Sequence, residues 1–304
     1  MIFFNLKKQP PAKPPLNSWL DIRLDLHMHS SHSDGTMSVP EIINHASKRK
    51  IQLLSLTDHD TLAGIKNARK LAKENDICFI PGIEISAKFS EGACHVLGYF
   101  IDEENSDFLE SIARLKSARE VRNEKMIAKL NELGLDISLA EILDLVDNKD
   151  VSIGRPHLAS IMVKKNYVKN FHEAFQIFLG VNGKAYVDKE LLSPQEAIEI
   201  INKASGMAFI AHPTSLKLND EELVKFFSKL KDAGLAGIEA FNSAHKAKDA
   251  RLYQSVANDL GLLISGGSDF HGTNKPRVKM GEAGLCGHLT GKQISSQILE
   301  KAFN

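Results

Sequence analysis

Short apolar runs and amphipathic stretches alternate along most of the chain. The apolar runs span residues 24–28, 51–56, 77–80, 93–100, 207–210, 236–241 and 262–266. The stretches between them repeat apolar residues every three or four positions, as helices that pack on a sheet do. Strands that are apolar throughout are typical of a parallel sheet covered on both faces. The pattern therefore predicts an α/β fold with a parallel sheet.

The ends of several helices are marked by their residues. Serine followed three positions later by glutamate satisfies free N–H groups at a helix start, and this pattern occurs at Ser38, Ser138 and Ser193. Glycine commonly ends a helix, and Gly206 and Gly234 follow two of the amphipathic stretches. These signals indicate helices between the predicted strands.

The alternation is interrupted between residues 104 and 185. Residues 107–133 predict one long helix with an apolar stripe, and further helices are expected to begin near Ser138, Gly154 and His172. No strand pattern returns before about residue 185. We interpret residues 104–185 as an all-helical insertion that divides an α/β domain into residues 21–103 and 186–304, preceded by a proline-rich extension at residues 1–20.

Composition narrows the class of protein. The 304 residues include 38 basic and 38 acidic side chains, a balance that gives no support for a long basic nucleic-acid groove. Three widely spaced cysteines, Cys78, Cys94 and Cys286, argue against a disulfide framework and fit a reducing cytoplasm. No run approaches the roughly 20 apolar residues of a membrane span, and the N-terminus lacks the pattern of a signal peptide. We expect a cytoplasmic protein without membrane attachment.

Residues able to bind metals recur where the predicted strands end. His27 and His29 are two positions apart, so in an extended strand their side chains project from the same face. Later strand ends carry more residues of this type: Asp58, His59, Glu84, His95, His212, Asp269 and His271. Divalent metals need several nitrogen and oxygen donors aimed at one point, and the carboxyl ends of barrel strands form such a rim. Asp58 could instead orient His59 or, as we favour, cap the next helix.

These residues form a specific set of motifs. The motifs are Asp25-x-His27-x-His29, Thr57-Asp58-His59, Gly82-Ile83-Glu84, Ala211-His212-Pro213 and Gly267-Ser268-Asp269-x-His271, with His95 as a further member. In this set, over about residues 21–290, the chain resembles the PHP (polymerase and histidinol phosphatase) superfamily. Gly154-Arg155-Pro156-His157 and the helical insertion resemble its TrpH-like branch, which includes nucleoside 3′,5′-bisphosphate phosphatase and the 5′-to-3′ exoribonuclease RNase AM.

The resemblance implies a distorted (β/α)7 barrel that binds two to three divalent metal ions. The expected ligands of the first ion are His27, His29, Glu84 and Asp269. Those of the second are Glu84, His95 and His212, and those of the third are Asp34, His59 and His271. Some superfamily members have histidine where this chain has Asp34, and a carboxylate there favours a harder metal. Mn2+ is therefore the expected ion, with Fe2+ or Zn2+ as alternatives.

The implied activity is a metal-dependent phosphoesterase for nucleotides. Bound divalent ions provide hydroxide at neutral pH and neutralise phosphate oxygens. The residues expected to act in catalysis through those ions are His27, His29, Glu84, His95 and Asp269. The implied reaction converts a nucleoside 3′,5′-bisphosphate to the 5′-monophosphate, trims short RNA from its 5′ end, or both. A site roofed by helices suits small nucleotides or single-stranded RNA ends, so no stable duplex binding is expected.

Five residues outside the metal motifs are candidates for substrate binding. Arg155 and His157 stand at a helix start, where free N–H groups favour phosphate, although a surface loop is the alternative. Arg119 and Arg122 share one face of the long helix and either reach over the barrel mouth or stay solvated. Asn242, at a strand end, is a candidate for the pocket wall.

Three other functions remain open at this point. A histidinol-phosphate phosphatase would use the same metals and differ in its pocket residues. An amidohydrolase that cleaves C–N bonds would also begin with H-x-H, but that class uses a metal-bridging lysine where this chain has Glu84 and His95. A non-catalytic metal-binding module would be expected to lack some ligands, whereas this chain has the full set.

Overall fold

The computed structural model describes residues 19–145, 151–188, 191–284 and 287–303. Most of the proline-rich extension and Cys286 therefore lie outside the described residues. Seven strands form one sheet in which their order follows the chain. They are β1 (Leu24–Asp25), β2 (Leu53–Leu56), β3 (Cys78–Ala87), β4 (Cys94–Tyr99), β5 (Met207–Ile210), β6 (Gly237–Asn242) and β7 (Leu263–Gly267). Each predicted apolar run contributes one strand, so the α/β fold is confirmed.

The direction of β4 departs from the prediction of a parallel sheet. β4 pairs antiparallel with both β3 and β5, whereas the other neighbouring pairs are parallel. Only residues 88–93 connect β3 to β4, and a parallel crossover needs about a dozen residues or more. The parallel expectation is therefore wrong for this strand. Its reversal puts the first residues of β4 at the rim where the parallel strands end.

β3 is long enough to pair with two neighbours in succession. Its first four residues pair with β2, and its last six, from Gly82 to Ala87, pair with β4. Gly82 stands at the changeover, where a Cβ atom would collide with the hydroxyl of Ser55. The second half of β3 therefore extends beyond the end of β2 and over the rim.

The segments that follow β1 and β7 lie side by side and nearly close the sheet into a barrel. The N–H of Asp269 donates to the carbonyl of His27 (2.8 Å), and the N–H of His29 donates to the carbonyl of Phe270 (2.9 Å). A Cβ at Gly267 would overlap the backbone of His27, so only glycine permits this approach. The expected distorted barrel is confirmed.

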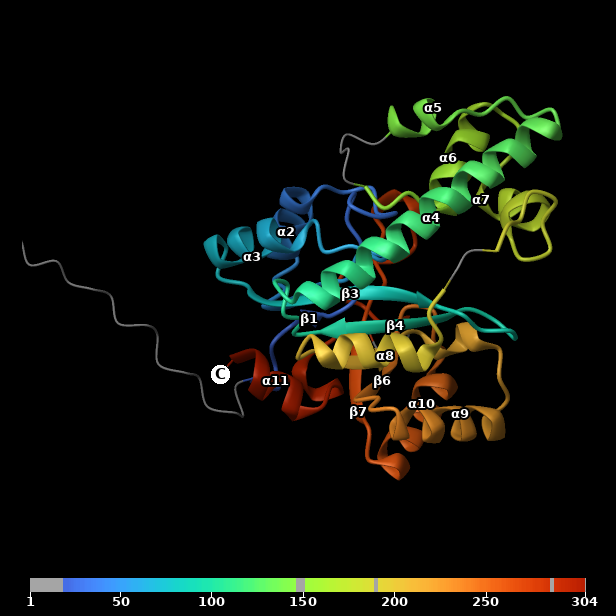
Figure 1. Cartoon of the computed structure of the whole chain (residues 1–304). Coiled ribbons are helices and arrows are strands. Elements are labelled where there is room, and N and C mark those ends of the chain that lie inside the picture. The colour runs from blue at the N-terminus through green and yellow to red at the C-terminus, as the bar shows by residue number, and fades with distance from the viewer. Residues whose placement is uncertain (1–18, 146–150, 189–190, 285–286, 304) are drawn as a thin grey trace, which may run out of the picture.

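Helices cover the outside of this barrel (Figure 1). They are α2 (Val39–Lys48), α3 (Ile65–Glu74), α8 (Pro194–Lys203), α9 (Asp220–Asp232), α10 (Ala247–Leu260) and α11 (Ser296–Phe303). The capping boxes predicted at Ser38 and Ser193 are present. α11 was not predicted, and it ends on Phe303, whose ring stacks on that of the buried Trp19.

Between β4 and α8 the described chain is helical, as predicted. It forms α4 (Ser106–Glu132), α5 (Leu139–Leu143), α6 (Arg155–Lys164), α7 (Phe171–Ala174) and the π-helix η1 (Phe175–Leu179). In Figure 1, α4 runs from the barrel into a lobe that contains α5, α6 and α7. We call this part, from Met126 to Ala185, the helical lobe.

α4 belongs to two hydrophobic cores. Phe108 and Leu115 pack in the barrel core, whereas Met126 and Leu130 pack in a second core built from buried residues of the helical lobe. One continuous helix therefore joins the barrel to the lobe.

The reversal of β4 also sets the direction of α4. The N–H of Asp102 donates to the carbonyl of Ala204 (2.9 Å), just before β5 begins, so α4 starts at the barrel end opposite the rim. Further along α4, Arg119 pairs with Asp60, just beyond the end of β2. α4 thus runs toward the rim and continues past it into the helical lobe.

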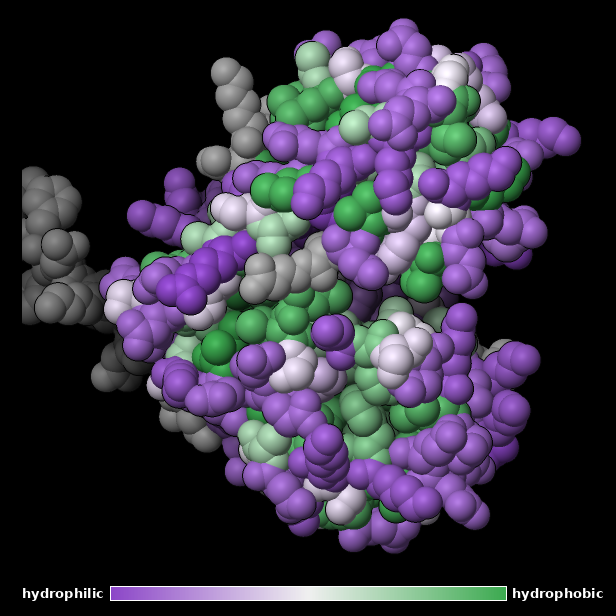
Figure 2. Space-filling model, turned by 45° about the vertical axis from the view of Figure 1, so that its right-hand side comes forward, coloured by the Kyte–Doolittle hydropathy of each residue, from purple (hydrophilic) through white to green (hydrophobic). Residues whose placement is uncertain are grey.

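No helix among the described residues is both long and apolar enough to cross a membrane. The face drawn in Figure 2 is mainly hydrophilic, with hydrophobic residues visible between charged ones.

Candidate metal centre

All nine metal-type side chains expected as ligands meet at the rim. They fall into four groups in which the potential ligand atoms lie within 4.8 Å of one another. The groups are His27, His29 and Asp269; His27, Glu84 and His212; His59, Glu84 and His95; and His29, Asp34, His59 and His271. These residues are spread over most of the sequence, and the barrel brings all of them together.

Glu84 is the common member of the cluster. Its Oε1 atom lies 2.9 Å from Nδ1 of His95 and 3.0 Å from Nε2 of His212. Its Oε2 atom lies 3.1 Å from Nε2 of His29 and 3.2 Å from Nδ1 of His59. The carboxylate can do this because Glu84 lies in the part of β3 that extends over the rim, not at a strand end as expected.

His95 reaches the centre from the start of its strand. It is the second residue of β4, so the expectation that it follows a strand is wrong. Because β4 is antiparallel to its neighbours, that position lies at the same rim as the ends of β2 and β5. β4 therefore brings His95 to the rim from its N-terminal end, whereas the parallel strands reach the rim with their C-terminal ends.

Asp34 is placed by the loop that follows β1. One of its oxygens lies 3.3 Å from Nε2 of His271, and the other lies 3.8 Å from Nε2 of His59. His29 is also near, with Nδ1 at 3.6 Å from Asp34. This group thus contains the three residues expected for one ion together with His29.

Asp58 holds the same loop, so our preference for a helix cap is wrong. The carboxylate accepts hydrogen bonds from the Ser30 N–H (2.8 Å), the Ser30 hydroxyl (2.6 Å) and the Ser33 hydroxyl (2.5 Å). The helix that follows begins only at Ile65, with Gly64 as its N-cap. Asp58 therefore fixes the turn that carries Asp34.

Three imidazoles are oriented through their Nδ1 atoms. Nδ1 of His27 donates to Glu239 (2.9 Å), that of His212 to the Ser215 hydroxyl (3.0 Å), and that of His271 to the Asp269 carbonyl (2.8 Å). An acceptor on Nδ1 leaves Nε2 as the ligand atom, as in many metal sites. In all three residues, Nε2 lies near a carboxylate of the cluster.

Glu239 is a buried carboxylate that sequence analysis missed. Besides His27, it accepts the backbone N–H of His212 (2.6 Å) and the side-chain amide of Asn242 (3.1 Å). The sequence feature that could have revealed Glu239 is its place as an acidic residue inside the apolar run of β6, where the structure buries it fully. One carboxylate therefore positions two members of the metal cluster.

The charged side chains of the cluster shift one another's pKa values. Burial alone would raise the pKa of Asp34, but the imidazoles of His271 and His59 outweigh it and hold that pKa well below its usual range. Burial would lower the pKa of His29, but the carboxylates of Asp269 and Glu84 raise it to about 9. Without metal, the carboxylates are therefore ionised and His29 is protonated at neutral pH.

The residues fit a divalent metal. Oδ1 of Asp34 and Nδ1 of His59 are buried, and although each has a polar neighbour within about 3.3 Å, neither makes a hydrogen bond of regular geometry in the part of the chain that the structure describes. Nε2 of His27 and Nε2 of His29 face each other at 3.2 Å, beside two carboxylates. Buried polar atoms need partners, and imidazole with carboxylate is a donor set that first-row divalent ions accept.

Two of the predicted substrate residues, Arg155 and His157, open α6 beside the rim. His157 is buried and accepts the N–H of Gly154 with Nδ1 (3.0 Å). The guanidinium of Arg155 lies over the ring of Phe175 (5.7 Å) and donates to a backbone carbonyl of the lobe. The rim itself is close, because the chain just before α6 is hydrogen-bonded to the loop after β1 (2.7 Å).

Arg119 and Arg122 are both buried, so the solvated alternative is wrong for both. Arg119 pairs with the carboxylate of Asp60. Nε of Arg119 and Nη2 of Arg122 have no hydrogen-bond partner among the described residues. Burial and the charges of Arg119 and Arg155 lower the pKa of Arg122 to about 9. The three guanidinium groups thus concentrate positive charge where α4 and α6 meet the rim.

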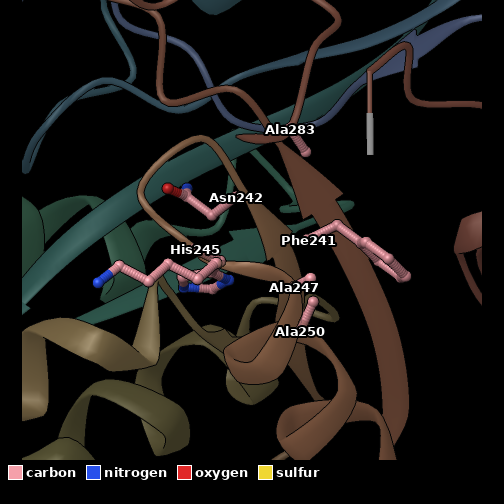
Figure 3. Close-up of a pocket in the computed structure, with 7 residues that line it drawn as sticks. Phe241, Asn242, His245, Ala247, Ala250 and Ala283 are labelled. Carbon is pink, nitrogen blue, oxygen red and sulfur yellow. The ribbon is translucent and has the colours of Figure 1, made fainter. Parts of the chain in front are cut away.

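Asn242 is buried at the end of β6, and both ends of its amide contact the protein. It donates to Glu239 (3.1 Å), and its oxygen accepts the N–H of Ala244 (2.9 Å). Figure 3 shows a narrow pocket beside it, with His245 and several apolar side chains in its lining, and this pocket is too narrow to hold a water molecule. These contacts place Asn242 as support for Glu239, and a direct contact with substrate stays a prediction.

Comparisons with known proteins agree with this geometry. The PHP domain family matches residues 25–248 of the chain. The chain is 31% identical over 248 residues to the 3′,5′-nucleoside bisphosphate phosphatase of Chromobacterium violaceum, covering 82% of this chain and 87% of the relative. It is 32% identical over 249 residues to a 5′-3′ exoribonuclease of Haemophilus influenzae, covering 82% and 90%. A solved structure from Bifidobacterium adolescentis, assigned as a metal-dependent phosphoesterase, matches with a TM-score of 0.80 and 27% identity over 92% of this chain and 94% of that one.

Proposed function

Because this chain belongs to the PHP domain family, we propose that it is a metal-dependent phosphoesterase that hydrolyses phosphate esters of nucleotides. The proposed substrates are nucleoside 3′,5′-bisphosphates, converted to 5′-monophosphates, and short single-stranded RNA, trimmed from its 5′ end. The bisphosphatase of Chromobacterium violaceum and the exoribonuclease of Haemophilus influenzae, both matched over most of their length, support this substrate class.

We propose that the nine clustered side chains hold three divalent ions, most favourably Mn2+. His27, His29, Glu84 and Asp269 would hold the first, Glu84, His95 and His212 the second, and Asp34, His59 and His271 the third. When bound, such ions activate water at neutral pH and neutralise the phosphate oxygens of the ester. The donor groups support Glu84 as a shared ligand, but they also cross this division: His27 is grouped with Glu84 and His212, His59 with Glu84 and His95, and His29 with both the first and the third set.

The protein's own residues hold this arrangement in place. Glu239 fixes the imidazole of His27 and the backbone of His212, and Asp58 fixes the loop of Asp34. Ligand atoms fixed before binding keep their geometry when the substrate arrives, which is the purpose of such supporting hydrogen bonds.

The observation that carries the nucleotide assignment is the guanidinium cluster of Arg119, Arg122 and Arg155 beside the metal centre, in which Arg119 and Arg122 are buried and Arg155 is half-buried. The three have one described ion pair among them, the pair with Asp60. Three guanidinium groups with one carboxylate favour a further anion, and arginine binds phosphate oxygens with two parallel hydrogen bonds. A substrate with a second phosphate, such as a 3′,5′-bisphosphate, would supply that anion. A histidinol phosphate has no second anionic group, so the cluster favours the nucleotide.

We further propose that residues 104–185 act as an inserted subdomain that covers the barrel mouth. Two contacts support this role: Ser152 bonds to the carbonyl of His32 (2.7 Å), and Arg119 pairs with Asp60. A covered mouth admits a mononucleotide or a single-stranded end and excludes a duplex. A nucleotide substrate and the free thiols of Cys78 and Cys94 support a cytoplasmic location.

The test is hydrolysis of adenosine 3′,5′-bisphosphate by the purified chain, with Mn2+ present and after chelation. The expected result is Mn2+-dependent release of phosphate with AMP as the other product. Histidinol phosphate, assayed under the same conditions, should be hydrolysed much more slowly. If the Mn2+-loaded protein leaves the bisphosphate intact and hydrolyses histidinol phosphate, the nucleotide assignment is wrong.

A further inference from the structure

Lys275 lies against the metal centre, although it belongs to none of the ligand motifs. Its Nζ atom is 2.5 Å from Oδ2 of Asp269. The other oxygen, Oδ1, faces the cluster, at 3.5 Å from Nε2 of both His27 and His29. The two oxygens of Asp269 thus have different partners: imidazoles on one side and the lysine on the other.

A fixed loop presents this lysine. Lys275 follows the short helix η3 (Gly272–Asn274), which is held against the loop after β1. The amide of Asn274 donates to the carbonyl of Asp34 (2.7 Å), and the N–H of Thr273 donates to the hydroxyl of Thr36 (2.9 Å). The backbone of Lys275 is therefore anchored to the segment that carries Asp34.

The side chain of Lys275 combines a buried contact with an open face. It is 40% exposed, whereas that of Asp269 is 11% exposed. An ammonium group has three N–H donors, and the described residues provide one hydrogen-bond acceptor, Asp269. The remaining donors are available to a ligand, because the side chain is partly exposed.

We propose that Lys275 is a substrate-binding residue whose ammonium group contacts the phosphoryl group at the metal centre. The inference rests on the proposed phosphoesterase function and adds a protein cation to the metals that would hold the phosphate. Its logic is electrostatic. If Asp269 helps to hold a divalent ion, the charge of that ion would offset the carboxylate and weaken its attraction for Lys275. An incoming phosphate then offers the ammonium group a new anionic partner at the same place.

The alternative is that Lys275 only holds Asp269 in position for the metal. The two roles differ in what they predict for a lysine that has lost its charge. A phosphate contact predicts weaker phosphate binding with metal affinity preserved. A positioning role predicts weaker metal binding, with the phosphate affinity of the metal-loaded protein preserved.

The experiment compares Lys275→Met and Lys275→Arg with the wild-type chain. Lys203→Met is the control, because Lys203 is an exposed lysine paired with Glu199 on the outside of α8. Calorimetry measures Mn2+ binding to each chelated protein and inorganic phosphate binding to each Mn2+-loaded protein. KM and kcat for adenosine 3′,5′-bisphosphate are measured in parallel.

In Lys275→Met, phosphate binding should weaken roughly ten- to a hundredfold, the range for one charge-assisted hydrogen bond. KM should rise by a similar factor, and Mn2+ affinity should change less than about threefold. Lys275→Arg should recover most of the phosphate affinity, and Lys203→Met should resemble the wild type. Unchanged phosphate binding, or a loss confined to Mn2+ affinity, would overturn the proposal, as would a wild-type protein that binds no phosphate. Phosphate binding that depends on Lys275 in a protein without hydrolytic activity would refute the proposed function and leave the inference standing.

Discussion

At the scale of single residues, Glu84 has the largest number of described partners in the cluster. Each of its oxygens lies within 3.2 Å of two imidazole nitrogens. In Glu84→Gln, the amide NH2 would face two of these nitrogens in place of an acceptor. We expect Mn2+ affinity to fall at least a hundredfold and hydrolysis to fall below about 1% of wild type, since both loss of a ligand and loss of its charge contribute.

Calorimetric Mn2+ titration and an activity assay measure this effect. Glu110→Gln is the matched control, because Glu110 is an exposed residue paired with Arg114 on α4. Wild-type Mn2+ affinity in Glu84→Gln would contradict the shared-ligand role.

The raised pKa of His29 predicts how the metal-free protein responds to pH. The pKa is about 9 in the fold and about 6.5 in an unfolded chain, so protonation of His29 favours the folded state. That stabilisation is complete below pH 6.5 and is lost as the pH rises through about 9. The melting temperature of the chelated protein should therefore fall between those values. The lowered pKa values of Asp34 and Glu84 act only near and below about pH 4, outside this window.

Scanning calorimetry of the chelated protein at constant ionic strength measures this fall in melting temperature with pH. Mn2+ competes with the same protons, so the rise in melting temperature that it causes should grow over the same range. A melting temperature that increased from pH 6.5 to about 9 without metal would count against the described cluster.

The ligand-type residues were predictable because histidines and carboxylates seldom follow buried apolar strands unless they bind something, and the family motifs fix their order. Glu239 and Lys275 were not predictable in this way, and Glu239 acquires its role from His27, a partner distant in the sequence. Lys275 is six positions from Asp269, but a lysine in a polar loop looks like an ordinary surface residue. Asp58 shows the same limit, because its partners precede it by a whole helix.

At the scale of elements, sequence periodicity located the strands but not their directions. The run that forms β4 is as apolar as its neighbours, and only the short connection at residues 88–93 distinguishes it. The helical segment was recognised as a whole, yet the boundary at residue 104 divides a region whose contacts do not separate there. Phe108, Ile112 and Leu115 of α4 pack in the barrel core.

The ion pair between Arg119 and Asp60 joins α4 to the rim, and it predicts a large effect on stability. Both side chains are buried, so Arg119→Ala would remove the guanidinium that pairs with the Asp60 carboxylate and should lower the free energy of unfolding by about 3–5 kcal/mol. Arg114→Ala removes a partner from the exposed pair with Glu110 on the same helix and should cost less than about 1 kcal/mol.

Urea unfolding of the two variants provides the comparison. Equal losses in the two variants would show that Asp60 finds another partner or that water enters the site.

At the scale of the whole molecule, the metal centre joins parts of the chain that are distant in sequence. Its donors extend from His27 to His271; Glu84 and His95 lie within β3 and β4, and the others lie in the segments that follow β1, β2, β5 and β7. An ion that binds the folded state and not the unfolded one stabilises the fold by about 2.7 kcal/mol per site at a concentration roughly 100 times its Kd. Chelation should therefore lower the melting temperature of the whole protein cooperatively, and Mn2+ should restore it.

Thermal unfolding followed by circular dichroism tests this expectation. Glu84→Gln is the control, and its melting temperature should respond much less to Mn2+. A wild-type melting temperature that did not change on chelation would mean that the cluster binds no metal tightly.

Because β4 is reversed, the length of α4 sets the distance between the helical lobe and the rim. A helix that follows a parallel strand leads away from the rim, but α4 starts at the opposite end and climbs toward it. Its 27 residues, at about 1.5 Å each, give it a length of roughly 40 Å. The first half packs along the barrel, and the second half extends beyond the rim. On the proposed role of residues 104–185 as a cover of the barrel mouth, adding or deleting turns in this one helix would change the distance between the helical lobe and the rim by about 5.4 Å at a time, without altering any of the nine ligand-type residues. An insertion of about seven residues in α4, close to two turns, would move the helical lobe away from the rim and keep the arginines of the helix on the same face. The length of substrate that fits can therefore evolve independently of the residues of the metal centre.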